Sequence, residues 1–251
     1  MHASYLIIIL IQIAIAGWVI YYFTHHDRGP KEPVGALRLA GVLGAVAVVI
    51  GVVVEGWVLS PGFASGNHSN LPLGVIAVDC LLVGLIEESA KALPLTAFIY
   101  RRGYFNELTD GIIYYGISGT VFGLLEDIGY TLIFGPGIGI ARIVSGPFMH
   151  AGLSSLFGFT VARRKVLKAR WWTPVAGFLG AVGLHALYDG GLFFGQAAAV
   201  LLAVFVAFAV NVGIFILYDQ ATRADVRRGM SSVGENRYCR HCGQPNPQHN
   251  L

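Results

Sequence analysis

The chain has 251 residues, of which 55% are hydrophobic and only 12% are charged. Soluble domains carry roughly 25% charged residues, so the composition excludes a water-soluble globular enzyme, a disordered chain and a nucleic-acid-binding domain. The formal charge of +3 identifies no partner by itself, because the positions of basic residues matter more than their number. Three cysteines are too few for a disulfide scaffold.

Apolar segments divide the chain into membrane spans. A helix needs about 20 mostly apolar residues to cross the hydrocarbon core of a bilayer. The first apolar segment lacks the basic start and the cleavage site of a signal peptide, so we expect it to remain as a helix. The sequence predicts an all-α, polytopic bundle of seven transmembrane helices, at residues 5–23, 36–54, 73–99, 111–134, 143–162, 174–194 and 197–217.

Lys and Arg are concentrated in alternate connections between these segments. Arg28, Lys31 and Arg38 lie at the first connection and five basic residues crowd the fifth, whereas the second and sixth connections have none. Because cytoplasmic loops carry the excess of Lys and Arg, this pattern predicts an outside N-terminus and a cytoplasmic C-terminus. We expect a multi-pass protein of a prokaryotic cytoplasmic membrane, with a membrane domain at 1–218 and a polar cytoplasmic tail at 219–251.

Ionisable residues inside four of the spans are the strongest functional signal in the sequence. Charged groups are costly at bilayer depth, so they usually face the interior of a bundle and serve its function. At about 1.5 Å of rise per residue their depths overlap, which predicts one wet cavity near the middle of the membrane. These residues are Glu87, Glu88 and Lys91 in the third span, Glu126 and Asp127 in the fourth, His150 in the fifth, and His185 and Asp189 in the sixth.

Helical spacing indicates how these side chains can interact. Lys91 lies three residues after Glu88 and four after Glu87, so it can pair with one carboxylate and leave the other free. Asp189 lies one turn after His185 and can orient its imidazole or ligate beside it. A carboxylate beside water in an apolar site can act as a general base, and two histidines with a carboxylate are usual zinc ligands. Both routes lead to hydrolysis of an amide.

Three short motifs resemble those of the PrsW family of intramembrane proteases, within the CAAX-protease and abortive-infection superfamily. They are Glu87-Glu88-x-x-Lys91, Phe122-x-x-x-Glu126 and His185-x-x-x-Asp189, with an isolated His150 between the second and the third. The resemblance covers residues 81–191. It implies an endopeptidase that cleaves a membrane-associated protein, as in site-1 cleavage of a regulatory protein such as an anti-sigma factor.

The same resemblance implies roles for the motif residues. It leaves open whether the mechanism is metal-dependent, with zinc, or a metal-free hydrolysis of the glutamate type. The implied roles are activation of water by Glu87 or Glu88 with support from Lys91, metal binding or oxyanion stabilisation by Glu126, His150 and His185, and orientation of His185 by Asp189.

Two other classes of membrane protein stay open at this stage. A proton-coupled transporter or channel could use the Glu/His cluster as a relay, although the sequence shows no internal repeat. The segment Gly116-Ile117-Ser118-Gly119 matches a rhomboid serine motif, with His185 as the partner of Ser118. Against it, the close glycine spacing expected after that histidine is missing.

The polar tail carries a second candidate metal site. Cys239 and Cys242 have the spacing of half a zinc ribbon, and His241 and His249 could complete four ligands. Two tails could also share one ion. The alternative is a disordered tail with a chance Cys-x-x-Cys pair. Zinc in the tail would be structural or regulatory and remote from the hydrolytic site.

Overall fold

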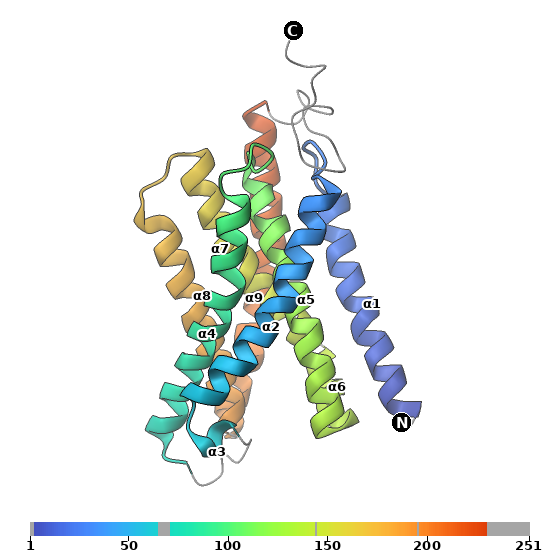
Figure 1. Ribbon diagram of the computed structural model, residues 1–251, viewed down its shortest axis with the longest axis vertical. Helices are drawn as coiled ribbons and strands as arrows, with labels where there is room; N and C mark the ends of the chain where they lie inside the picture. The colour runs from blue at the N-terminus through green and yellow to red at the C-terminus, as the bar shows by residue number, and fades with distance from the viewer. Residues whose placement is uncertain (1–2, 65–70, 144, 195, 230–251) are drawn as a thin grey trace.

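The computed structural model describes residues 3–64, 71–143, 145–194 and 196–229 (Figure 1). The all-α prediction is confirmed, because these residues contain only helices joined by turns and short loops. The helices are α1 (Ala3–His25), α2 (Val34–Val58), α3 (Pro61–Ala64), α4 (Leu73–Ile99), α5 (Leu108–Phe134), α6 (Pro136–Ile143), α7 (Gly146–Val166), α8 (Trp172–Phe193) and α9 (Ala197–Arg227). Each predicted span corresponds to one of the long helices.

Five of the long helices are long and apolar enough to cross a membrane, namely α1, α2, α5, α8 and α9. The other two, α4 and α7, carry more polar and charged residues along their length. Helix α4 has Asp79, Glu87, Glu88 and Lys91 buried inside the protein, and α7 ends in the basic run Arg163–Lys165. Composition therefore identifies a polytopic membrane protein, while the count of seven spans and the orientation of the termini stay predictions.

Helices α5 and α7 pack with their backbones in direct contact. A Cβ atom on Gly111 of α5 would lie 2.2 Å from the carbonyl oxygen of Gly158 on α7. A Cβ atom on Gly119 would lie 2.2 Å from the carbonyl oxygen of His150. Small residues allow this close approach in membrane bundles, where backbone contacts replace the hydrophobic driving force. The contact brings the start of α7, which carries His150, against the second half of α5.

Two short helices were not predicted. Helix α3 follows α2, and α6 follows Gly135, whose φ of 93° lies in the left-handed region that favours glycine. Helix α6 occupies residues that the sequence assigned to a loop and to the start of the fifth span. The fifth predicted span therefore begins at Gly146 rather than at residue 143.

Helix α9 continues to Arg227, beyond the predicted end of the last span at residue 217. Its extension is amphipathic, because Tyr218, Ala221, Thr222 and Asp225 recur at helical spacing and are all buried. The hydroxyl of Tyr218 donates a hydrogen bond of 2.8 Å to the carbonyl of Phe23. Residues 219–227 of the predicted tail thus extend the helical bundle, whereas Cys239 and Cys242 lie outside the described residues.

Candidate active site

Helix α4 supplies two glutamates and a lysine to the interior of the bundle. The ammonium group of Lys91 lies 2.7 Å from Glu88 Oε1 and 3.8 Å from Glu87 Oε2. All three side chains are buried. Lys91 therefore pairs with both carboxylates, closely with Glu88 and at a longer distance with Glu87.

His185 of α8 joins both glutamates. Its Nδ1 lies 3.0 Å from Glu88 Oε1, so an N–H at Nδ1 donates to that carboxylate. The lone pair then lies on Nε2, which is 3.7 Å from Glu87 Oε2 and 3.4 Å from Asp189 Oδ2. The expected neighbourhood of His185 and Asp189, one turn apart on α8, is present.

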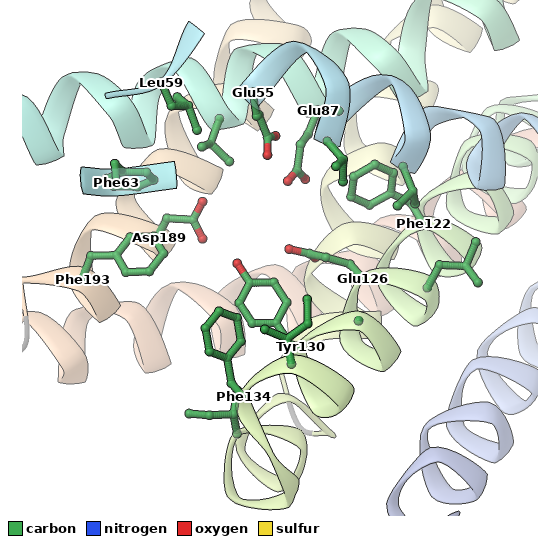
Figure 2. A pocket seen from close by; sticks show the side chains of 18 residues that line it. Glu55, Leu59, Phe63, Glu87, Phe122, Glu126, Tyr130, Phe134, Asp189 and Phe193 are labelled. Atoms are coloured by element: carbon green, nitrogen blue, oxygen red, sulfur yellow. The ribbon is translucent and has the colours of Figure 1, made fainter. Parts of the chain in front are cut away.

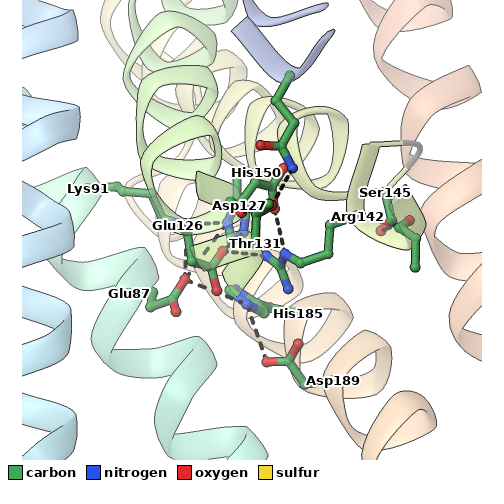
Figure 3. Close-up of polar contacts among 12 residues, drawn as sticks. Glu87, Lys91, Glu126, Asp127, Thr131, Arg142, Ser145, His150, His185 and Asp189 are labelled. Carbon is green, nitrogen blue, oxygen red and sulfur yellow. Dashed lines mark hydrogen bonds and ion pairs between the residues drawn. The ribbon is translucent and has the colours of Figure 1, made fainter. Parts of the chain in front are cut away.

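His150 of α7 reaches the same point from the other side. Its Nε2 lies 2.7 Å from Glu126 Oε2, which accepts the N–H of that nitrogen. Its Nδ1 lies 3.8 Å from Glu87 Oε2 and 3.1 Å from Lys91 Nζ. The rings of His150 and His185 meet edge to face with their centroids 5.2 Å apart. Figure 3 shows how side chains of α4, α5, α7 and α8 converge here.

Three of these residues fit a metal ion. Glu87, His150 and His185 each offer one ligand atom, and these atoms lie within 4.8 Å of one another. Zinc ligands at about 2.1 Å from a tetrahedral ion are roughly 3.4 Å apart, close to the separations of 3.7 and 3.8 Å around Glu87 Oε2. Within the described part of the chain that oxygen accepts no hydrogen bond although it is buried, so it is available to a ligand.

Glu126 lies beside this group rather than within it. The family resemblance implied metal binding or oxyanion stabilisation by Glu126, and its Oε2 lies 2.7 Å both from His150 Nε2 and from Nη2 of Arg142. Arg142 comes from α6 and also pairs with Asp127, and its guanidinium carbon lies 4.1 Å from the centre of the Tyr130 ring. The arginine therefore balances two carboxylates and holds Glu126 against His150.

Arg142 was not predicted as a site residue, because it lies in the connection between the fourth and fifth predicted spans. The sequence did contain a sign of this role, because Arg142 is the single Lys or Arg of a connection predicted to lie on the outer side of the membrane, where basic residues are few. Its side chain turns back into the bundle because α6 folds against the end of α5, where the carboxylates of Glu126 and Asp127 attract it.

A cavity of about 500 Å³ lies next to the cluster (Figure 2). The carboxylates of Glu55, Glu87, Glu126 and Asp189 point into it, and Glu88 is absent from its lining. Aliphatic and aromatic side chains form the rest of the wall, including Leu59, Phe63, Tyr130, Phe134 and Phe193. The cavity joins the polar cluster to an apolar space that can hold part of a peptide.

Glu55 is the second residue that the sequence analysis missed. It ends the apolar run of the second predicted span, where boundary charges are common, and helix α2 continues past it to Val58. Ionisable residues inside a span were taken as candidates for the site, so Glu55 would have been included if the second span had been extended by one residue.

Ser118 does not meet His185. Ser118 is 1% exposed, its hydroxyl has no hydrogen-bond partner among the described residues, and it does not line the cavity. His185 contacts carboxylates instead. The serine–histidine pair of the rhomboid alternative is therefore not assembled in this structure.

Together the helices and the site define a polytopic membrane protein with a buried Glu/His cluster, the class to which membrane-embedded peptidases belong. Residues 32–217, well over half of the chain, match the family model described as "PrsW family intramembrane metalloprotease". The chain belongs to this family. That membership favours a metalloprotease over the transporter and rhomboid alternatives.

Curated relatives agree with the family match. The chain is 34% identical over 110 residues to Protease PrsW of Geobacillus kaustophilus, covering 43% of this chain and 49% of that protein. It is 29% identical over 174 residues to Protease PrsW of Bacillus subtilis, covering 68% and 76%, and 28% identical over 152 residues to that of Clostridioides difficile, covering 58% and 61%. The chain thus spans about half the length of the first relative. No solved structure matches it. The bacterial relatives and the candidate spans indicate a bacterial multi-pass membrane protein.

Proposed function

We propose that this chain is an endopeptidase of the bacterial cell membrane that hydrolyses a peptide bond of a membrane protein, with Glu87, His150 and His185 at its centre. One observation carries the proposal. A buried carboxylate oxygen of Glu87, free of hydrogen bonds within the described residues, faces a lone-pair nitrogen of each histidine beside the cavity. Each ring is oriented by a carboxylate at its other nitrogen.

The three side chains would hold zinc through Glu87 Oε2, His150 Nδ1 and His185 Nε2. When bound, zinc supplies a nucleophilic water at neutral pH and polarises the scissile carbonyl. Two outer carboxylates support the donor set, since Glu126 and Glu88 accept the remaining ring N–H groups and so keep each ligand nitrogen unprotonated.

Asp189 is the residue that we propose to accept a proton from the attacking water, at its Oδ2. Two facts support this role: the carboxylate lines the cavity, and it lies 3.4 Å from the ligand nitrogen of His185. Glu88, one of the two bases expected from the sequence, instead holds Lys91 and His185 and does not line the cavity. Its role is to position His185.

A metal-free mechanism is the second candidate, and one contact favours it. Lys91 Nζ lies 3.1 Å from His150 Nδ1, where it occupies the lone pair that zinc would need. In this arrangement Glu87 itself takes the proton from water, and Lys91 and His185 provide positive charge or hydrogen-bond donors to the developing oxyanion. Both mechanisms use the same residues, so a measurement of bound metal is needed to distinguish them.

The first test catalogues new protein N-termini in membranes from cells that produce the native chain or Glu87→Gln at equal abundance. We expect N-termini that vanish in the variant, and these would also name the substrate; membrane-anchored regulatory proteins such as anti-sigma factors are the first to inspect. Asp219→Asn removes an exposed carboxylate of α9 and is the matched control. Identical catalogues for all three proteins under several stresses would contradict the proposal.

The second test measures bound metal. We expect the purified chain to contain one zinc ion at the intramembrane site, to lose cleavage on chelation and to regain it with zinc. In His150→Ala the intramembrane zinc should be absent, as measured by elemental analysis of a protein truncated after residue 229 to remove the tail cysteines. Full cleavage by zinc-free protein would establish the metal-free mechanism instead.

A further inference from the structure

Glu55 is the cavity carboxylate that lacks a cation. Its side chain points into the cavity from α2, beside Glu87 and across from Glu126 and Tyr130 (Figure 2). The structure records no ion pair for it among the described residues, and its buried Oε1 has no hydrogen-bond partner there. A buried, ionised carboxylate without a partner is costly in free energy, and a cation beside it lowers that cost.

The other cavity carboxylates already lie beside side chains that carry, or on protonation can carry, a positive charge. Glu126 pairs with Arg142 at 2.7 Å, and Asp189 lies 3.4 Å from His185. Glu87 belongs to the group of three residues that can hold a metal ion, and Glu55 is not a member of any such group in the described part of the chain. A second metal ion at Glu55 is therefore not supported, which leaves a positively charged group of the substrate as the candidate partner.

Glu55 also lies close to the reacting centre. A Cβ atom on Gly51 would be 3.7 Å from Glu55 Oε1, 3.8 Å from Glu87 Cγ and 3.9 Å from Phe122 Cζ. The two glutamates thus meet around the same point of α2. An extended peptide advances about 3.3 Å per residue, so a substrate bound at Glu87 would bring its neighbouring side chains within reach of Glu55.

The wall around Glu55 suits a long basic side chain. Val52, Leu59 and Val83 give an aliphatic surface next to the carboxylate. Lys and Arg combine an aliphatic stem with a terminal cation, so their stems can cover apolar surface while the charged end meets an acid. An acidic side chain would be repelled by the Glu55 carboxylate, and a small polar side chain would leave the aliphatic surface uncovered.

We infer that Glu55 is a specificity-determining residue, which binds the side chain of a substrate Lys or Arg within about three residues of the scissile bond. This inference rests on the proposed function, because it names the substrate class of the same site. It does not involve Glu55 in the chemical step. The expected consequence is a preference for sites with a nearby basic residue over otherwise identical sites without one.

The test uses a substrate identified through its Glu87-dependent N-terminus, produced in its native form and with the nearby Lys or Arg replaced by Gln or by Glu. Each form is combined in membranes with the full-length protease carrying Glu55, Glu55→Asp, Glu55→Gln or Glu55→Lys. The readout is the ratio of cleavage rates between substrate forms at equal protease abundance. Asp219→Asn again controls for removal of a carboxylate.

We expect the native protease to prefer the basic substrate by about 10- to 100-fold, the range for a charge-assisted hydrogen bond. Glu55→Gln should reduce this ratio to near one, and Glu55→Asp should keep most of it. Glu55→Lys should reverse it, so that the Lys→Glu substrate is cleaved faster. An unchanged ratio in Glu55→Gln and Glu55→Lys, or Glu87-dependent sites without nearby basic residues, would overturn the inference and leave the proteolysis intact. Absence of any Glu87-dependent cleavage would instead overturn the proposed function.

Discussion

Two groups of buried carboxylates lie toward opposite ends of α5, and they differ in what they contact. At the active site Glu87, Glu126 and Asp189 face imidazoles, an arginine and a cavity. At the start of α5 a second group, here called the capping cluster, consists of Asp27, Glu32, Glu107, Asp110 and Asp225, of which four are under 10% exposed. Its members contact backbone N–H groups and hydroxyl groups instead.

Helix capping explains the second group. Glu107 and Asp110 form a capping box in which each side chain accepts the backbone N–H of the other residue. Asp225 of α9 accepts the N–H groups of Leu108 and Thr109, both at 3.0 Å. These are donors that the first turn of a helix leaves unpaired. Both groups therefore contain buried carboxylates. The groups that these carboxylates contact distinguish the candidate active site from the capping cluster, whose role is structural.

The sharpest test of this contrast compares His185→Ala with Asp225→Ala. We expect His185→Ala to slow cleavage by roughly 100- to 10,000-fold, the effect of losing a general acid–base group or a metal ligand. The cleavage rate per folded molecule should be unchanged in Asp225→Ala. Rates on an identified substrate, corrected for folded protein by size-exclusion chromatography, provide the measurement. Equal losses in both variants would remove the distinction between the two clusters.

Replacing Arg142 should lower both the stability of the protein and its rate of cleavage. Arg142→Gln leaves Glu126 and Asp127 without their cation, and breaking a buried ion pair costs about 3–5 kcal/mol. Cleavage should fall as well, because Glu126 loses the contact that holds it against His150. The matched control is Arg223→Gln, which breaks an exposed pair with Asp219 and should cost at most about 1 kcal/mol. Unfolding in detergent distinguishes the two, and similar losses would contradict the role of Arg142.

The active-site cluster could be predicted from the sequence to a large extent, and the capping cluster could not. Glu87, Glu126 and His185 lie in apolar segments, where any ionisable residue is conspicuous. Glu107 and Asp225 lie in polar segments next to the spans, where carboxylates are common and their burial depends on α9 returning to the start of α5. Arg142 was missed for a similar reason, because its partners are set by the fold of α6 and not by local spacing.

Asp225→Ala should reduce stability without affecting chemistry. It leaves the N–H groups of Leu108 and Thr109 without their acceptor inside the protein, which costs about 1–3 kcal/mol. Asp225→Asn, which keeps one acceptor oxygen, should retain part of that stability. Thermal unfolding of the three proteins in one detergent checks the order, and a stability of Asp225→Ala equal to that of the native chain would refute it.

The remaining prediction concerns pH and the residue Glu107. Burial, together with the nearby carboxylates of Asp110, Asp27 and Asp225, raises the pKa of Glu107 to about 9 from an ordinary value of 4.5. The folded protein keeps a proton that the unfolded chain releases, so this contribution to stability is complete below about pH 4.5 and is lost as the pH rises toward 9. The slope is at most about 1.4 kcal/mol per pH unit.

Glu107→Gln removes this titration and should flatten the fall in stability between pH 6 and 9. Unfolding midpoints of both proteins at several pH values in the same detergent provide the comparison. A native protein whose stability does not fall over this range would show that the capping cluster is ionised.

The direct backbone contact of α5 and α7 also has a mechanical consequence. Gly111 and Gly158 each leave no room for a side chain between the two helices, so neither helix can slide or tilt without breaking contacts along its length. Glu126 and His150 are carried by this rigid pair. The opposite wall of the cavity comes from α2 and the short α3, and Trp57 of α2 is exposed on the outer side of this wall. If a protein chain enters this cavity, we therefore expect the α2–α3 side to move, while Glu126 and His150 keep their relative positions.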